Sequence, residues 1–123
     1  MIIAFWIVTG LAALVFLATG TLKLVRSREA LAASGLAWTE DFTDLQVKLI
    51  ALAEVLGAIG LVLPVLLDIL PILSPIAAIL LAVLMTGATV VHLRRKEPPL
   101  PIALVALTVA SAVLGFIVVL GQP

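Results

Sequence analysis

Cysteine is absent from the 123 residues of this chain. Without thiols there is no disulfide, no thiolate zinc site and no CxxC redox centre. The single histidine excludes bis-histidine haem ligation within one chain, because that ligation needs two imidazoles. Charged residues make up only 11% of the chain, and seven basic residues balance seven acidic ones. Nucleic-acid binding requires a concentrated basic surface, so the composition gives no indication of a nucleic-acid partner.

Hydrophobic residues, in contrast, make up 64% of the chain, against about 45–50% in an average soluble domain. A helix that crosses a bilayer needs about 20 mostly apolar residues, because its backbone must be hydrogen-bonded internally. Four stretches satisfy this requirement, with approximate bounds 2–24, 45–67, 72–93 and 100–120. The sequence therefore predicts an all-α fold, in which residues 1–123 form a single domain that is an integral membrane four-helix bundle.

The basic residues predict how this bundle is oriented, because cytoplasmic loops retain Lys and Arg. No basic residue precedes the first apolar stretch, so we expect it to remain as a helix and not to be cleaved as a signal peptide. The basic residues flank or fill the first and third connections: Lys23, Arg26, Arg28, Lys48, Arg94, Arg95 and Lys96. We therefore expect both termini to lie outside the cytosol.

The first connection is predicted to hold a short interfacial helix. Ser27 is a suitable N-cap and Gly35 a suitable residue just past the C-terminus, with Trp38 at headgroup depth. Thr43 and Gln46 then fit a capping box that begins the second membrane helix. The second connection is predicted to be a turn in the interface, punctuated by prolines and one acid: Pro64, Asp68, Pro71 and Pro75.

Ionisable residues within or at the ends of the spanning stretches are the candidates for function, because they are costly in a membrane. Helical Cα–Cβ bonds tilt toward the helix N-terminus. Lys23 and His92 therefore lean into the bilayer, whereas Glu54, on an oppositely directed helix, leans toward them. We expect these three side chains to converge at one depth.

Other residues share helix faces with this cluster. We name Thr19, Met85 and Thr89 as further ligand-binding or proton-handling candidates. Small side chains allow close helix approach, and four residues are predicted to serve helix packing: Gly20, Ala51, Gly57 and Ala58. Trp6 and Trp38 are interpreted as interface anchors.

Each functional interpretation has a structural alternative. Glu54 can be a carboxyl, protonated or paired with Lys23, that only fixes helix register. Lys23 can be an anchor that extends to the interface, and His92 beside a basic run can be an interfacial anchor.

Three segments, residues 19–24, 48–64 and 85–95, read TGTLKL, KLIALAEVLGAIGLVLP and MTGATVVHLRR. Together they resemble the DoxX-like family of small bacterial membrane proteins over nearly the whole chain. The chain departs from the family at Ala51, where glycine is usual, and near Ile72, where an aromatic residue is frequent. The resemblance implies a four-helix bundle in the bacterial cytoplasmic (inner) membrane, with Lys23, Glu54 and His92 as its polar positions.

The resemblance implies less about activity. Some relatives are membrane subunits linked to the oxidation of thiosulfate or other sulfur compounds, with quinone as acceptor, and others act in membrane-protein assembly or trafficking. Our first hypothesis is a subunit that binds a quinone-like or other amphipathic molecule at the cluster, where His92 or Lys23 donates to a carbonyl and Glu54 handles the proton. We expect no metal and no electron carrier within the chain, so a redox partner would dock at the cytoplasmic loops.

Two other hypotheses belong to different classes. One is a non-catalytic assembly or scaffold protein, in which the cluster holds the helices in register. The other is a small proton-coupled exporter, which fits poorly because small multidrug transporters have their essential Glu in the first helix. The disulfide-exchanging quinone reductases are excluded by the lack of cysteine. A chain of this size often associates with itself, so a homo-oligomer is also expected as an alternative to a larger partner.

Overall fold

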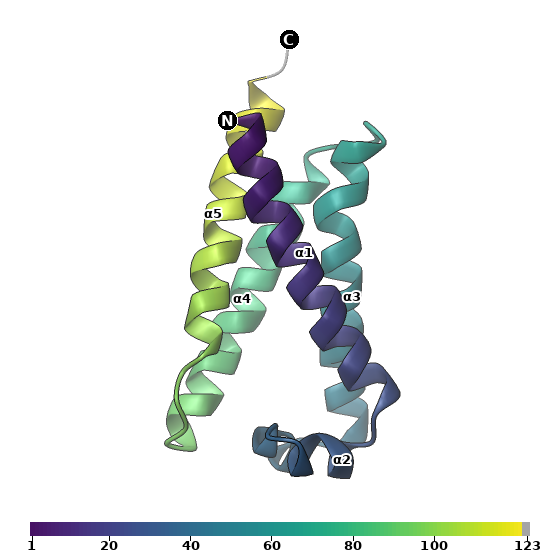
Figure 1. The fold of residues 1–123 in the computed structure, drawn as a ribbon, viewed down its shortest axis with the longest axis vertical. Coiled ribbons are helices and arrows are strands. Elements are labelled where there is room, and N and C mark those ends of the chain that lie inside the picture. Colours follow the sequence, from purple (N-terminus) through teal and green to yellow (C-terminus); the bar gives the residue numbers. More distant parts are fainter. Residues whose placement is uncertain (122–123) are drawn as a thin grey trace.

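The computed structural model describes residues 1–121, and its regular elements there are all helical. The four long helices are α1 (Ile2–Val25), α3 (Asp44–Leu66), α4 (Leu73–Arg94) and α5 (Pro101–Leu120). A short helix α2 (Arg28–Ala33) and a 3-10 helix η1 (Ala37–Asp41) connect α1 to α3 (Figure 1). The long helices contain 24, 23, 22 and 20 residues and are apolar enough to cross a membrane. The predicted all-α fold with four such helices is confirmed.

Helix α5 places small and polar side chains inside and large aliphatic ones outside, whereas α1, α3 and α4 also bury Phe16, Leu61 and Leu81. In α5 the buried residues are Thr108, Ser111, Ala112 and Gly115, whereas Val109, Val113 and Ile117 are exposed. In water, exposed aliphatic side chains would be unfavourable. In a membrane they are not, because lipid tails are as apolar as leucine, and small interior residues let the helices approach closely. The packing of the bundle is therefore that of a multi-pass membrane protein.

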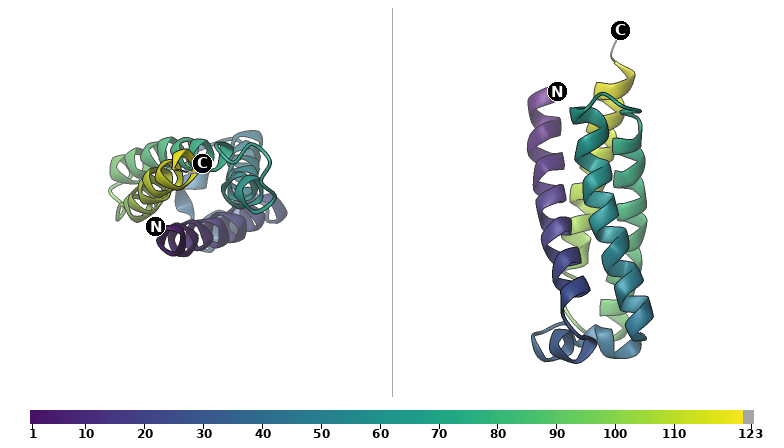
Figure 2. Two further views of the ribbon diagram at one scale, coloured as in Figure 1. Left: turned by 90° about the horizontal axis from the view of Figure 1, so that it is seen from above. Right: turned by 90° about the vertical axis from the view of Figure 1, so that its right-hand side faces the viewer.

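The bundle consists of two helix pairs. α1 packs mainly against α3 and α4 mainly against α5, with fewer contacts between the pairs. The pairs lie close together where α1 begins and α5 ends, and they separate toward the opposite end, beneath which α2 lies (Figures 1 and 2). We call the first the closed end and the second the open end.

Tight contacts and buried hydrogen bonds hold the closed end. A Cβ on Gly115 would lie 3.1 Å from Pro75 Cβ and 3.3 Å from Phe5 Cε1, so a larger residue fits there only if these neighbours shift. The Ser74 hydroxyl donates to the Leu61 carbonyl at 2.6 Å and joins α4 to α3. Between α1 and α5, the hydroxyls of Thr9 and Ser111 are 2.6 Å apart. The closed end is thus fixed by all four long helices.

Several local predictions about element ends are confirmed. The Ser27 hydroxyl accepts from the backbone of Ala30, and the capping box of Thr43 and Gln46 is present in full. Gly35, just past α2, adopts φ +108°, which glycine tolerates because it has no Cβ. The prediction for the second connection is wrong in two places. Pro64 lies within the last turn of α3 and Pro75 within the first turn of α4, so the turn itself covers residues 67–72.

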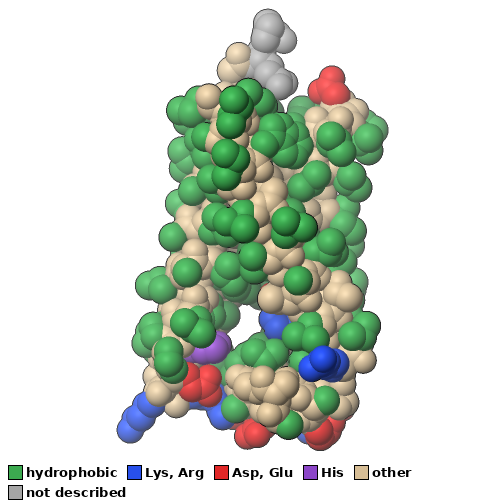
Figure 3. All heavy atoms as spheres, in the orientation of Figure 1, with side chains coloured by type: hydrophobic (Ala, Val, Ile, Leu, Met, Phe, Trp, Pro, Cys, Tyr) green, Lys and Arg blue, Asp and Glu red, His purple; other side chains and the backbone are tan. Residues whose placement is uncertain are grey.

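All seven Lys and Arg residues lie at the open end, where blue side chains gather in Figure 3. One of them stabilises a helix terminus. The Lys48 ammonium donates to the carbonyls of Lys23, at 2.6 Å, and of Leu24 and Arg26. The last carbonyls of a helix have no partner within it, so Lys48 of α3 caps α1. The hydrogen bond to the Lys23 carbonyl fixes the backbone of Lys23.

Candidate functional site

An ion pair between α1 and α3 forms one side of the site. Lys23 Nζ lies 3.0 Å from Oε1 and 2.9 Å from Oε2 of Glu54, and the Thr19 hydroxyl donates to Oε1 at 3.3 Å. The Glu54 residue is only 1% exposed. Gly20 makes the pair geometrically feasible, since a Cβ there would lie 2.9 Å from the Ala51 carbonyl oxygen. The convergence of Lys23 and Glu54 expected from the sequence is therefore present as a direct contact.

The connection between α1 and α3 supplies an aromatic side chain to the site. Trp38 of η1 is 9% exposed, and its ring centroid lies 5.3 Å from Lys23 Nζ. A cation near an aromatic face is attracted by the ring quadrupole. The Arg28 guanidinium donates to the Phe42 carbonyl at 2.7 Å, which ties the end of this connection to α2. Trp38 consequently lies between the two helix pairs at the open end.

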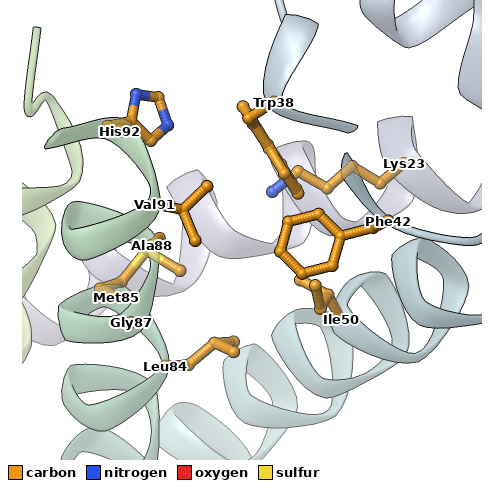
Figure 4. A pocket seen from close by; sticks show the side chains of 10 residues that line it. All are labelled: Lys23, Trp38, Phe42, Ile50, Leu84, Met85, Gly87, Ala88, Val91 and His92. Atoms are coloured by element: carbon orange, nitrogen blue, oxygen red, sulfur yellow. The ribbon is translucent and has the colours of Figure 1, made fainter. Parts of the chain in front are cut away.

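A cavity of about 240 Å³ lies beside Trp38, between α3 and α4. Figure 4 shows its lining, with the Lys23 ammonium and one ring nitrogen of His92 directed into it from opposite sides. Apart from these two residues, its walls are apolar: Trp38, Phe42, Ile50, Leu84, Met85, Gly87, Ala88 and Val91. Ligand sites are typically of this type, with few polar groups in a mostly apolar wall.

A second cavity of about 260 Å³ adjoins the first and opens between α1 and α5. The two share five lining residues, namely Lys23, Trp38, Met85, Ala88 and His92. Thr19, Glu54 and Leu104 line only the second. In Figure 3 the background is visible through an opening beside the purple histidine. The site is therefore a transverse passage between the helix pairs, with one opening at α3 and α4 and another at α1 and α5.

His92 lies across this passage from the ion pair. Its ring centroid is 6.5 Å from that of Trp38, and its Nδ1 is 3.5 Å from Oε2 of Glu97. That Nδ1 is buried and has no hydrogen-bond partner of acceptable geometry among residues 1–121. With Nδ1 near Glu97, the nitrogen directed into the passage is Nε2. His92 thus joins Lys23 and Glu54 through a shared cavity and not by contact.

A surface network connects the site to the loops of the open end. The Arg95 guanidinium lies 2.7 Å from Asp41 Oδ2 and 2.7 Å from Glu97 Oε1. Its hydrogen bonds to Asp41, and secondly to Glu97, raise the pKa of Arg95 further above its usual range. Arg95 is consequently a permanent cation that links η1 to the loop after α4.

The charges of the site balance, and hydrogen-bond donors remain free. Lys23 and Glu54 neutralise one another, which makes a separate ionic ligand unfavourable. An ammonium has three N–H groups, and the described residues account for two at Lys23, both to Glu54. The third, together with His92 Nε2 when that nitrogen is protonated, can donate to an acceptor in the passage. The arrangement is suited to an uncharged polar head, such as a carbonyl-bearing ring.

Comparison with known protein families gives one result for this arrangement. The model of the DoxX-like family matches residues 7–119, which is most of the chain. The chain belongs to this family. No curated protein and no solved structure matches it. This DoxX-like chain is therefore a small multi-pass membrane protein.

In this DoxX-like protein only some of the other candidate residues line the cavities. Met85 lines both cavities, whereas the Thr89 hydroxyl donates to the Met85 carbonyl of its own helix at 2.8 Å. Ala51 and Ala58 are buried, and a Cβ on Gly57 would lie 2.6 Å from Leu81 of α4. Trp6 is remote from the site and packs edge-on against Phe5 at the closed end.

Sequence reasoning about this DoxX-like protein missed part of the lining. Leu84, Gly87, Ala88 and Val91 lie at helical spacing beside Met85 and His92, and the isolated glycine in that stripe is the signal that indicates an opening. Glu97 also escaped notice. Its approach to His92 depends on the loop after α4 folding back, with Lys96 at φ +58°.

Proposed function

We propose that this protein is a membrane subunit that binds a quinone-like or other amphipathic small molecule in the passage and supports a redox partner. The observation that carries the proposal is the passage itself, in which Lys23 and His92 direct polar groups from opposite sides into an otherwise apolar cavity. A site used only for helix packing would be filled by side chains, because cavities lose packing contacts.

The residues of the site fit a quinone ring. Lys23 and His92 Nε2 can donate to ring carbonyls, and Trp38 offers an aromatic face at the side of the cavity. Glu54 holds the Lys23 ammonium in position and is the group through which a proton can be exchanged with the site. A bound quinone would supply the capacity to accept electrons and protons. The chain would supply binding, orientation and protection from water.

The partner and the orientation are part of the proposal. Because the basic residues gather at the open end, we place that end at the cytoplasmic face of a bacterial inner membrane, with both termini outside the cytosol. The α2–η1 segment then lies in the membrane interface. A redox protein would dock there, on the loops that follow α1 and α4, and bring its electrons close to the passage.

The test compares bound small molecules in matched variants. The protein is purified from its native membrane in mild detergent, and co-purifying quinones are quantified by mass spectrometry. The Lys23→Met/Glu54→Leu double variant removes both charges together, so no unpaired charge is left and the fold is retained. The polar head of the ligand then loses the Lys23 ammonium as its hydrogen-bond donor. The matched control is Thr9→Ala/Ser111→Ala, which removes a buried polar pair at the closed end.

We expect near-stoichiometric quinone with the unmodified protein and the control, and little with the charge-pair variant or with His92→Ala. A folded charge-pair variant that keeps its quinone would contradict the proposal, and so would unmodified protein without any quinone or other bound amphipathic molecule.

A scaffold role is the second candidate, and the doubly hydrogen-bonded Lys23–Glu54 pair favours it. Under that role the charge-pair variant would still assemble its complexes. Neither the unmodified protein nor the variants would then co-purify with a bound small molecule. Proton-coupled export has less support, because the Glu54 carboxylate is already occupied by Lys23 and is not free to receive a cationic substrate.

A further inference from the structure

An apolar groove runs along the outer face between α3 and α4, above the first cavity. It has a volume of about 480 Å³, and its walls are aliphatic: Ala53, Leu56, Gly57, Ala77, Leu80, Leu81, Val83 and Leu84. Gly57 forms part of its floor, where the missing side chain leaves Leu81 of α4 in direct contact with α3. The groove faces the region that lipid tails would occupy.

The groove adjoins the candidate site. Leu84 lines both the groove and the first cavity, and from there the groove follows α4 to Ala77. This separation of seven positions corresponds to about 10 Å of helix at about 1.5 Å per residue. A molecule with its polar head beside Lys23 and His92 would therefore have, next to the cavity, an apolar groove that leads away from the open end.

We infer that this groove binds the single long apolar tail of the ligand, so that the substrate class is an amphiphile with one compact uncharged head and one isoprenoid or alkyl tail. The inference rests on the proposed function and extends it from the head to the tail. The ligand enters from the lipid between α3 and α4, with its head foremost.

The opposite opening, between α1 and α5, is less suited to the tail. It lies next to Leu100 and Pro101, at the very start of α5 and thus near the end of the bundle. Farther along these helices, the hydrogen bond between Thr9 and Ser111 holds α1 and α5 together. On the α3 and α4 side, Leu84 lines both the cavity and the groove, and Gly87 leaves the cavity rim without a side chain.

The experiment measures affinity for two probes with the same head, the tail-free ring of ubiquinone and the same ring with a decyl tail. Binding is followed by quenching of Trp38 fluorescence in detergent, in a Trp6→Phe background that leaves Trp38 as the one tryptophan. Ala53→Phe fills the groove without touching the cavity, because Ala53 lines only the groove. The matched control is Ala106→Phe, on an exposed face of α5. Leu104→Phe narrows the opposite opening.

We expect the decyl probe to bind about three- to tenfold more tightly than the tail-free probe, a modest gain because its tail moves from apolar detergent to apolar protein and gains only packing. Ala53→Phe should remove this advantage and leave the tail-free probe unaffected, and Ala106→Phe should change neither.

Two results would overturn the inference while the proposed function stands. In the first, both probes bind with equal affinity. In the second, Leu104→Phe removes the decyl advantage and Ala53→Phe does not, which would place the tail between α1 and α5. Failure of both probes to bind would instead contradict the proposed function, and the tail site with it.

Discussion

The two ends of the bundle are built from the same four helices by different means. At the closed end, Gly115 packs tightly against Pro75 and Phe5, and the buried polar groups are hydroxyls that satisfy one another or a carbonyl. At the open end, the helix pairs separate around Trp38, and the buried polar groups are the charges of Lys23 and Glu54. The first arrangement specifies the fold, and the second leaves room for a ligand.

This difference shows where each property of the molecule is located. A packed end can hold the helices together, so that the other end can retain a cavity and a costly ion pair. Sites that bind ligands commonly include groups that do not favour the fold by themselves. Substitutions at the closed end should therefore change stability alone, and several at the open end should change binding alone.

The largest effect should come from breaking the ion pair on one side. Glu54→Leu leaves the buried Lys23 ammonium without its partner, and the free energy of unfolding should fall by about 3–5 kcal/mol. The Lys23→Met/Glu54→Leu variant should regain most of this loss, because no unpaired charge remains. Unfolding in detergent followed by circular dichroism measures both. A double variant as unstable as the single one would contradict this expectation. It would show that the ion pair itself stabilises the helix packing, and that removing the unpaired charge is not enough.

Two glycine substitutions compare the ends directly. Gly115→Leu should cost about 1–3 kcal/mol, because Pro75 and Phe5 must move to make room for the larger side chain. It should leave quinone affinity unchanged. Gly87→Leu places the same side chain where nothing lies within 4 Å. It should keep the melting temperature and weaken quinone binding, because Gly87 lines the first cavity. Equal losses of stability in the two variants would contradict the distinction between the ends.

A smaller effect is expected from one hydroxyl of the closed end. Ser74→Ala removes the buried hydrogen bond to the Leu61 carbonyl and should destabilise the protein by about 1 kcal/mol, without an effect on ligand binding. Thr86→Ala is the control, since the exposed Thr86 hydroxyl only donates to a carbonyl of its own helix. The two melting temperatures should differ, with Thr86→Ala close to the unmodified protein.

The smallest change in stability should follow loss of the Asp41–Arg95 bridge. Asp41→Asn should leave the melting temperature within error, because exposed ion pairs contribute little. It should nevertheless release η1 from the loop after α4, and acrylamide should then quench Trp38 fluorescence more strongly in a Trp6→Phe background. Arg94→Gln, in the same basic run, is the control. Unchanged quenching in Asp41→Asn would show that other contacts hold Trp38.

The sequence was informative wherever a local rule decides the structure. The Ser27 cap and the Thr43 and Gln46 capping box follow from helix geometry over a few residues. The approach of Lys23 to Glu54 links two helices, and it follows from their opposite directions and the tilt of their Cα–Cβ bonds. The position of Trp38 does not, because it depends on how far the helix pairs separate. Its burial beside Lys23 and His92 was not predicted, and its expected position at headgroup depth stays a prediction. Likewise, the contact of Glu97 with His92 depends on the path of a loop.

The two-sided passage has a consequence for how binding should be quantified. Under the proposed function, the ligand reaches the passage from the lipid around the helices, so the site samples the membrane plane and not the bulk solution. The concentration that governs its occupancy is the mole fraction of the ligand among the lipids. A sparingly water-soluble compound can therefore saturate the site at a vanishing aqueous concentration, and lateral diffusion in two dimensions sets the rate at which it arrives.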